Sequence, residues 1–507
     1  MIMFAKKSTE RKVFSMNKSI QHFEEVGIRK LEKVIENFLK DPKDMAGFVH
    51  GIQNGVIELA LDIIKETLED CDQMLRESAK RKSGWVIVRR DEKQLVTSLG
   101  EICFRKTLFK SREDGHSEYL LDTILGMDPH ERMTEDAEAE LLKEVADASY
   151  QKAGTECSIQ ASVSKQTVKN KIHELDFSRA PKPCVRKKRQ VKYLYIDADE
   201  DHVALQFRNA KGDLQVNEWG YKSNCAIAKL IYVYEGIKKE HPKSKRHYLV
   251  NTYYFSGIYA GEAGNAALWD EVYRYLEETY DLDYVEKIFL NGDGGKWIKA
   301  GKKRISGITY VLDGFHLQQY LMRATSHLLD SAEDARKELM EAMKAGTKED
   351  LKAVFARIYN VTETEAGMKR VQRSETYFLE NWMAIKIRLN WRRMAKGCSA
   401  EGHVSHVLSA RMSSRPMGWS MTGADKMAHL RAYKWNGGDM LELVRAQRKA
   451  ELPKAAGAEN EVISGTEMLS YERKSYSKLG KYVTSISHHL SLDSKKKAWF
   501  QSQIWGL

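Results

Sequence analysis

Apolar positions in the first hundred residues recur at helical spacing. One stripe repeats every three or four residues through Ile57, Leu61, Ile64, Leu68, Cys71 and Leu75. Acidic residues lie off this stripe, which is typical of an amphipathic helix. Such a helix packs in a core or pairs as a coiled coil; because the stripe runs for fewer than three heptads, the pattern favours a core helix.

The pattern changes to strand character beyond Trp85. Residues 101–109 are rich in β-forming side chains, Asp114-Gly115 is a turn dipeptide, and Tyr119-Leu120-Leu121 is again apolar. This arrangement predicts a β-hairpin with its turn at Asp114-Gly115.

Helical spacing returns between about 135 and 176. The first predicted helix carries Leu141, Leu142, Val145, Ala148 and Tyr150, and a second covers residues 151–157. A third begins at Ser164, a favoured N-cap residue. Val168 and Ile172 then face inward, which leaves the following side chains outward: Lys165, Gln166, Lys169 and Asn170. The pattern predicts a helix-turn-helix whose last helix enters a DNA groove, although helices that bind nothing also open this way.

A basic linker follows this segment. Pro181 and Pro183 exclude regular helix, and four consecutive cations come next, at Arg186, Lys187, Lys188 and Arg189. A run of this kind either follows a phosphate backbone or is simply a solvated surface.

From residue 191 the chain alternates between strand-like and helical runs. Strands are predicted at 191–196, 202–207, 230–234, 248–255, 285–290 and 308–312, with a helix at 268–276. The succession of strands, a helix, a strand, and then a strand and a helix is that of an RNase H-like α/β domain. Acidic residues follow three of the runs, where ligands of α/β sheets gather: Asp197, Asp293 and Asp313.

Residues 323–396 are helical in pattern, which predicts an all-helical insertion into that domain. The segment closes with Arg392 and Arg393, and Glu401 then opens another helical run. Mg²⁺ prefers hard oxygen ligands, and paired metal ions favour phosphodiester cleavage, so carboxylates are the expected ligands. We expect Asp197, Asp293 and Glu401 to bind Mg²⁺, with Mn²⁺ as a substitute.

The choice at the first position is Asp197 because it directly ends an apolar run, although Asp199, Glu200 and Asp201 crowd the same site. Arg411 and Arg415, four residues apart, are further candidates for phosphate contacts.

Charge and composition agree with a nucleic-acid partner. Lys and Arg number 82 against 71 Asp and Glu, a net charge of +11, which favours polyanions but also fits an ordinary basic protein. The chain has no apolar run long enough to span a membrane and no signal-peptide core, so a cytoplasmic location is expected. Its 6 cysteines lack C-x-x-C spacing, which argues against a disulfide framework or a zinc site.

Three motifs together resemble bacterial insertion-sequence transposases of the ISLre type, a group of DDE transposases similar to the Mutator-like transposases. They are Asn291-Gly292-Asp293-Gly294, Leu312-Asp313-Gly314-Phe315-His316 and the long segment Gly397–Ser420. The resemblance runs from about Asn17 to the 420s. It implies an RNase H-like fold, a helical insertion and a DDE triad at Asp197, Asp293 and Glu401. It also implies an Asp-x-x-His motif at Asp313 and His316. Two readings of His316 stay open: a donor that orients a neighbouring carboxylate or phosphate, and a histidine that caps a helix or packs in the core.

The implied function is Mg²⁺-dependent cleavage of DNA 3′ ends and strand transfer. The expected partners are double-stranded terminal inverted repeats, target DNA and a second copy of the chain, as a homodimer or higher assembly at the bacterial nucleoid. Two alternatives stay open: an RNase H-like nuclease or recombinase without strand transfer, and a transposase-derived DNA-binding regulator.

The predicted organisation has eight parts. They are a helical region (1–90), a β-hairpin region (91–134), a helix-turn-helix (135–178), a basic linker (179–190), the first part of the core (191–322), the helical insertion (323–396), the last core helix (397–434) and a C-terminal helical region (435–507).

Overall fold

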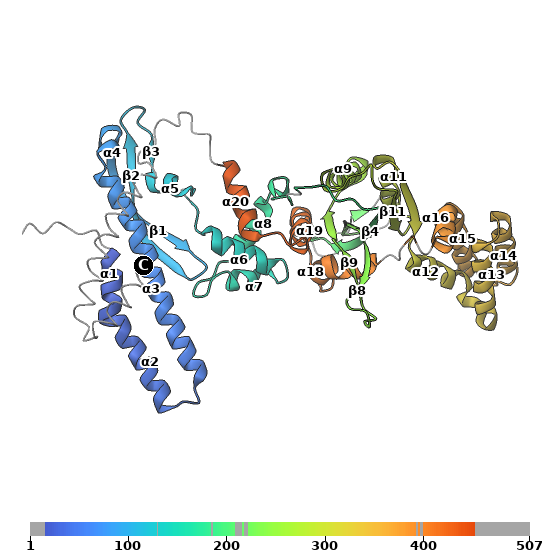
Figure 1. Ribbon diagram of the computed structural model, residues 1–507, viewed down its shortest axis with the longest axis horizontal. Helices are drawn as coiled ribbons and strands as arrows, with labels where there is room; N and C mark the ends of the chain where they lie inside the picture. The colour runs from blue at the N-terminus through green and yellow to red at the C-terminus, as the bar shows by residue number, and fades with distance from the viewer. Residues whose placement is uncertain are drawn as a thin grey trace, which may run out of the picture. The chain divides into compact units, whose positions relative to one another are not determined.

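The computed structural model describes residues 16–128, 130–183, 186–207, 215–216, 222–391, 394–395 and 399–451. These residues form a mixed α/β structure that divides into two compact units (Figure 1). The first contains the described residues up to Glu140, together with Thr155–Ser162 and the end of the last helix from Arg448. The second contains Leu141–Gly154 and the described part of Val163–Gln447.

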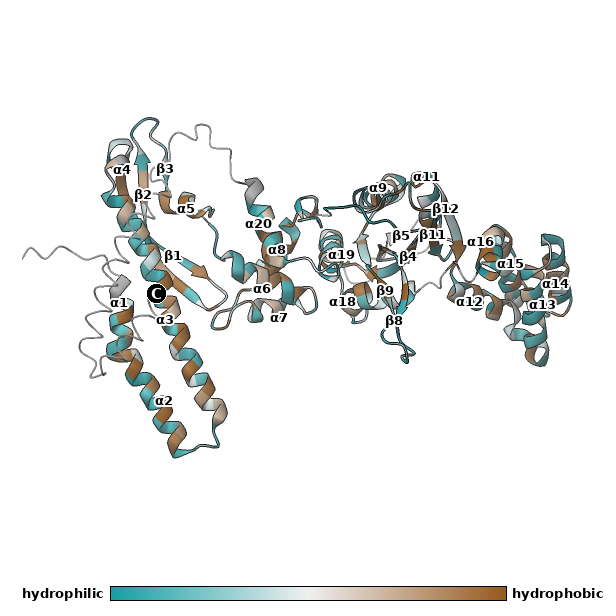
Figure 2. Cartoon of the chain, in the orientation of Figure 1, coloured by the Kyte–Doolittle hydropathy of each residue, from teal (hydrophilic) through white to brown (hydrophobic). Residues whose placement is uncertain are grey.

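The first unit packs helices against a small antiparallel sheet. Its elements are α1 (Met16–His22), η1 (Phe23–Gly27), α2 (Ile28–Lys40), α3 (Met45–Glu77), α4 (Ala79–Gly84), β1 (Trp85–Val96), β2 (Glu101–Ser111), β3 (Ser117–Glu118) and α5 (Leu120–Leu125). Brown and teal alternate along α2 and α3 in Figure 2, as expected for amphipathic helices. The stripe of α3 packs on β2, where Leu61, Ile64 and Leu68 contact a core that includes Phe104 and Phe109. The prediction of a core helix is confirmed.

The predicted hairpin needs correction. Its long strands are β1 and β2, joined by a turn at residues 97–100, and β1 begins at Trp85, inside the range expected to be helical. The Asp114-Gly115 turn leads only to the two-residue strand β3. Leu120 and Leu121 instead begin α5, and both are buried. Neighbouring residues of a strand point to opposite faces, whereas a helix can bury two in succession.

The second unit is built on a five-stranded mixed sheet. Its strands are β4 (Tyr193–Ala204), β7 (Cys225–Tyr234), β10 (Tyr253–Gly257), β11 (Lys287–Gly292) and β12 (Ile308–Leu312). Their order is β10-β7-β4-β11-β12, in which β4, β11 and β12 are parallel and β7 runs against both of its neighbours. Two ribbons lie outside this sheet: β5 (Gln215–Val216) with β6 (Lys222–Ser223), and β8 (Gly236–Lys239) with β9 (His247–Val250).

Three of the predicted strands have different limits. Residues 191–196 and 202–207 were expected to form separate strands, but β4 is continuous through Asp197 because β7 pairs with it from Tyr195 to Ala204. The run 248–255 is split between β9 and β10 at Asn251, whose φ of 53° interrupts extended backbone. The other predicted strands are confirmed with small shifts in their ends.

The helices of the second unit share one hydrophobic core with the sheet. They include α9 (Gly261–Thr279), α10 (Lys296–Lys299), α11 (Gly301–Arg304), α12 (Gly314–Thr325), η3 (Ser326–Ser331), α13 (Ala332–Lys344), α14 (Lys348–Asn360), α15 (Glu365–Glu380) and α16 (Trp382–Asn390). The predicted helical character of 323–396 is confirmed for its described residues. Phe355, Phe378 and Ile385 of this segment belong to the same core as Leu290 and Leu312 of the sheet, so the segment has no separate core.

The remaining helices belong to the predicted DNA-binding segment and to the part of the chain that begins at Ala400. They are α6 (Glu135–Val145), α7 (Tyr150–Glu156), α8 (Lys165–Glu174), η2 (Phe177–Arg179), α17 (Ala400–Val404), η4 (Ser405–Ser409), α18 (Ala410–Met412), α19 (Met421–Trp435) and α20 (Met440–Glu451). No helix among the described residues is both long and apolar enough to cross a membrane. Residues 452–507, most of the predicted C-terminal helical region, lie outside the described residues.

Candidate active site

Strand register aligns the acidic residues of three neighbouring parallel strands. Asn291 of β11 pairs with Asp197 of β4, and Gly292 pairs with Leu312 of β12. Side chains of paired residues point to the same face, and that face recurs every two residues. Continuing the same register, Asp199 of β4, Asp293 just after β11 and Asp313 just after β12 stand in a row on one face. Asp197 and Asn291 lie one step behind this row.

Asp197 is enclosed by hydrogen-bond donors. It is fully buried. Its carboxylate accepts from Tyr232 Oη at 2.7 Å, Tyr234 Oη at 3.3 Å, Asn291 Nδ2 at 2.6 Å and the backbone N–H of Ser399 at 3.3 Å. A carboxylate has about four acceptor sites, so protein donors alone satisfy Asp197.

Asp199 has the opposite surroundings. It is half-buried, and its carboxylate accepts a hydrogen bond from the backbone N–H of Glu200 at 2.9 Å. Burial raises the pKa of Asp199 to about 6, and the negative charge of Asp293 adds to that increase. Two carboxylates that repel one another are hard oxygen donors that a divalent cation would stabilise. Asp199 and Asp293 therefore fit a Mg²⁺ ion.

The Asp-x-x-His motif lies beside this pair. Asp313 caps α12 and accepts from the backbone N–H of His316 at 3.3 Å, and His316 Nδ1 lies 3.0 Å from the same carboxylate oxygen. The hydrogen bond to Asp313 raises the pKa of His316, and Asp293 and Asp199 add to the increase while burial opposes it. The motif thus combines helix capping with a basic group that faces the acidic row.

The turn that carries Asp293 is braced from the helical segment. Tyr377 of α15 donates a hydrogen bond to the backbone carbonyl of Asp293, and the ring of Tyr320 stacks on Tyr377 with centroids 3.7 Å apart. Gly294 has φ of 104°, in the region that favours glycine, and Asp293 Oδ1 accepts from the N–H of Gly295 at 2.8 Å. Sequence reasoning missed Tyr377 because it lies 84 residues from Asp293 and no local pattern marks it.

Glu401 is exposed in the first turn of α17. The preceding Ser399 donates to Asp197, which attaches this short helix to β4. Within the described part of the chain, no three His, Cys, Asp or Glu side chains are grouped closely enough to hold a metal ion. The structure therefore does not bring Asp197, Asp293 and Glu401 together as a three-ligand metal site. It places Asp199 near Asp293, and it carries Glu401 on a helix attached to β4.

His403, also on α17, is part of the packing. Its ring stacks on Tyr232 at 4.3 Å, its Nδ1 lies 2.8 Å from Tyr254 Oη, and burial lowers its pKa to about 4. His403 therefore has a packing role. His406 is exposed.

The predicted recognition helix is α8. Ser164 caps it by accepting from the N–H of Thr167 at 3.2 Å, and Val168 and Ile172 are fully buried. Lys165, Gln166 and Asn170 are exposed and Lys169 is half-exposed. The preceding segment differs in one respect: α6 ends at Val145, and Tyr150 starts α7, so Ala148 and Tyr150 are not part of the first helix. DNA contact by α8 stays a prediction.

Several predicted phosphate contacts have other surroundings. Arg411 is buried, donates to the carbonyl of Val145 at 3.0 Å and lies over the Trp419 ring at 4.8 Å, and burial lowers its pKa to about 10. The prediction that Arg411 meets phosphates is therefore wrong. Because α18 ends at Met412, Arg415 does not share a helix with Arg411, and Arg415 is exposed.

The four cations of the basic linker are all exposed. Arg189 in addition forms an ion pair with Glu235 at 3.0 Å, and its backbone N–H donates to the carbonyl of Thr279. Arg189 is thus a brace within the second unit. Arg392 and Arg393 lie outside the described residues.

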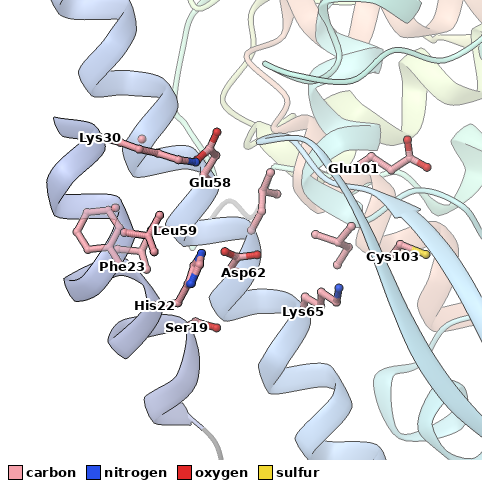
Figure 3. Close-up of a pocket in the computed structure, with 15 residues that line it drawn as sticks. Ser19, His22, Phe23, Lys30, Glu58, Leu59, Asp62, Lys65, Glu101 and Cys103 are labelled. Carbon is pink, nitrogen blue, oxygen red and sulfur yellow. The ribbon is translucent and has the colours of Figure 1, made fainter. Parts of the chain in front are cut away.

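The first unit contains a cavity of about 360 Å³ between α1, α2, α3 and β2 (Figure 3). Its wall includes a Lys30–Glu58 ion pair of 2.7 Å, and it holds none of the candidate residues above. The acidic row in the second unit is therefore the candidate active site.

The described structure is thus a mixed α/β protein with carboxylates gathered beside neighbouring parallel strands. The chain belongs to the Uncharacterised protein family UPF0236, whose model matches residues 39–449.

Similar proteins come from Caldanaerobacter subterraneus subsp. tengcongensis. One UPF0236 protein, whose name joins eleven locus designations, is 35% identical over 421 residues, which cover 83% of this chain and 84% of that protein. A second, whose name joins four designations, is also 35% identical and covers 82% and 84%. A solved structure, the Drosophila P element transposase strand transfer complex, aligns over 62% of this chain and 92% of that chain with 9% identity. Its TM-score of 0.19 is too low to support a conclusion about the fold.

Proposed function

We propose that the protein is a DDE-type DNA transposase with an RNase H-like core, encoded by a bacterial insertion sequence. The observation that carries the proposal is the row of Asp199, Asp293 and Asp313 beside one another on parallel strands. The succession β4, β7, β10, α9, β11, β12 and α12 is also the order expected of an RNase H-like domain, and it supports the proposal.

We further propose Asp199, Asp293 and Glu401 as the catalytic carboxylates, with Asp199 in place of Asp197. Hydrogen bonds from four protein donors already satisfy the carboxylate of Asp197, whereas the carboxylate of Asp199 lies near that of Asp293. Mg²⁺, when bound, supplies Lewis-acid stabilisation of the phosphate and of the leaving oxygen. Asp199 and Asp293 provide its oxygen ligands, and Glu401 is the third carboxylate, on a helix attached to β4 through Ser399.

The other residues of the site position this chemistry. Tyr377 holds the turn that carries Asp293, and His316 brings a basic group to the acidic row. Such a group stabilises negative charge on a phosphate that approaches the carboxylates. Asp197 of β4 accepts a hydrogen bond from the backbone N–H of Ser399, the residue directly before α17. This bond orients α17 relative to β4.

The relatives support a mobile element. Single curated proteins of one bacterium carry eleven and four locus designations, as expected when a gene has spread through a genome. We propose that the present chain acts on the DNA ends of its own element. Because strand transfer joins two ends to one target, we expect a homodimer or higher assembly.

DNA binding by this transposase is assigned to α8 and the linker. The exposed side chains of Lys165, Gln166 and Asn170 lie on one accessible face of α8, and the linker adds the cations of Arg186–Lys188. Lys165→Ala combined with Lys169→Ala is expected to weaken end binding and reduce its salt dependence.

The test uses labelled duplex DNA from the flanks of the gene, a supercoiled target plasmid, and Mg²⁺ or Mn²⁺. A transposase gives joined products, and these products disappear in Asp199→Asn and in Asp293→Asn while DNA binding is retained. Cutting without joining supports a nuclease or recombinase instead, and binding without cutting supports a regulator. Unchanged cutting by Asp293→Asn contradicts the proposed carboxylate set.

A further inference from the structure

The ribbon β8–β9 stands apart from the five-stranded sheet. Its two strands pair only with each other, from Gly236 opposite Val250 to Lys239 opposite His247, and Figure 1 shows the ribbon projecting away from β4. Half-buried Ile237 and Leu249 are its apolar pair. Four-residue strands bury little apolar surface, so packing alone does not explain why the chain builds this projection.

The ribbon carries a concentrated positive charge. Between residues 236 and 250 the acidic side chain is Glu240, whereas five cations are exposed: Lys238, Lys239, Lys243, Lys245 and Arg246. In the described part of the chain, none of these five lies within ion-pair distance of a carboxylate. Like charges on a small ribbon repel one another. A polyanion that neutralises them would remove that cost.

The tip of the ribbon has a defined shape. Ser244 N–H donates to the carbonyl of His241 at 2.9 Å, Arg246 N–H donates to Ser244 Oγ at 2.9 Å, and Glu240 N–H donates to the carbonyl of Arg246 at 3.2 Å. The turn that presents Lys243, Lys245 and Arg246 is therefore ordered by its own bonds. Behind it, Lys238 stands opposite Tyr248, an aromatic residue that is 48% exposed.

The base of the ribbon is fixed to the rest of the second unit. Glu235 accepts from Asn251 Nδ2 at 2.8 Å and from Arg189 Nη1 at 3.0 Å, and its N–H bonds to the carbonyl of Val250 at 2.9 Å. Arg186–Lys188 directly precede Arg189. Three residues span at most about 10 Å, so the linker cations lie near the ribbon base and extend its basic surface.

We propose that β8–β9 is a DNA-binding arm that contacts the phosphates of duplex DNA, separately from α8. The inference rests on the proposed function, because it takes duplex DNA as the partner of this protein. The major groove admits a two-stranded β-ribbon as well as a helix, and lysine and arginine side chains neutralise the flanking phosphates. In this arrangement Arg189 positions the arm and does not itself meet DNA.

The test compares two triple variants of the full chain. The first variant removes the charges of the tip by Lys243→Ala, Lys245→Ala and Arg246→Ala. The second is the matched control and removes three exposed lysines of α13 and α14, by Lys344→Ala, Lys348→Ala and Lys352→Ala. Duplex binding is measured at several salt concentrations. Three lost phosphate contacts reduce the slope of log affinity against log salt by roughly 2 to 3 and weaken binding on the order of 10- to 100-fold. The control variant keeps the slope of the unaltered chain.

Two results overturn the inference: an unchanged slope in the tip variant, and an equal loss in both variants, which reflects net charge alone. A second measurement does not depend on removing three charges. Lys243→Cys is expected to react by thiol–disulfide exchange with a duplex that carries a mixed disulfide on its tether, releasing the small thiol and leaving protein and DNA cross-linked. Lys348→Cys is not expected to react, and absence of the Lys243→Cys product counts against the arm. If the tip variant loses slope while the unaltered chain neither cuts nor joins DNA, the arm stands and the transposase proposal fails.

Discussion

Asp197 and Asp199 stand two residues apart on the same face of β4, yet their surroundings are opposite. Asp197 is enclosed by four donors, whereas the pKa of Asp199 is raised by burial and by the charge of Asp293. A buried carboxylate with enough donors holds the structure together. A carboxylate held beside a like charge is destabilised unless a cation binds, which is typical of functional sites.

The largest expected effect separates the two carboxylates by activity. Asp199→Asn should abolish Mg²⁺-dependent cleavage, a loss of several kcal/mol of transition-state stabilisation or on the order of 1000-fold in rate. Single-turnover cleavage of labelled duplex measures it. Asp201→Asn is the matched control on the same strand, because the carboxylate of Asp201 accepts from Ser413 Oγ at 2.8 Å and takes no part in the proposed reaction. Unaltered cleavage by Asp199→Asn would restore Asp197 as the first ligand.

The next effect separates them by stability. Asp197→Asn places an amide N–H₂ among groups that donate hydrogen bonds, and we expect a loss of about 3 kcal/mol in the free energy of unfolding. Urea denaturation without divalent ions measures this change. Asp199→Asn, the same substitution two residues away, should not destabilise the chain. Equal destabilisation of both variants would remove the distinction drawn between the two positions.

The pH dependence of stability sharpens the comparison. Burial raises the pKa of Asp199 in the folded chain to about 6 from its ordinary value of 3.8, so the folded state binds more protons between these two pH values. Its contribution to stability is present below about pH 4 and is lost as the pH rises to about 6. At pH 7 in EDTA, Asp199→Asn should be more stable than the unaltered chain by about 3 kcal/mol, and the two should converge near pH 4. A constant difference across this range would contradict the assignment.

The smallest effect concerns the brace behind Asp293. Tyr377→Phe removes the hydrogen bond to the Asp293 carbonyl and is expected to cost about 1 kcal/mol of stability and to slow cleavage a few-fold. Tyr320→Phe is the control, because it keeps the ring that stacks on Tyr377. Cleavage and urea denaturation measured side by side reveal whether the turn matters for activity. An equal response from both variants would mean that only the stacked rings are needed.

Local periodicity in the sequence was sufficient for much of the fold. The stripe of α3, the capped helix α8, the strands β7, β11 and β12, and the helical run from α12 to α16 all follow from hydrophobic spacing and capping residues within a few positions. Asp293 and Asp313 were found because each directly follows a strand.

Only the tertiary structure decided which of the carboxylates meet. Asp199 faces Asp293 because β11 pairs with β4 in one register, and a shift by a single residue would turn every side chain to the other face. Arg411 is buried against Val145, far away in the sequence, and the strand that pairs with β2 is β1 and not the segment after the turn. The sequence carries periodicity within each element. Register, burial of single charges and strand partners depend on contacts between residues tens to hundreds of positions apart, and local patterns do not encode them.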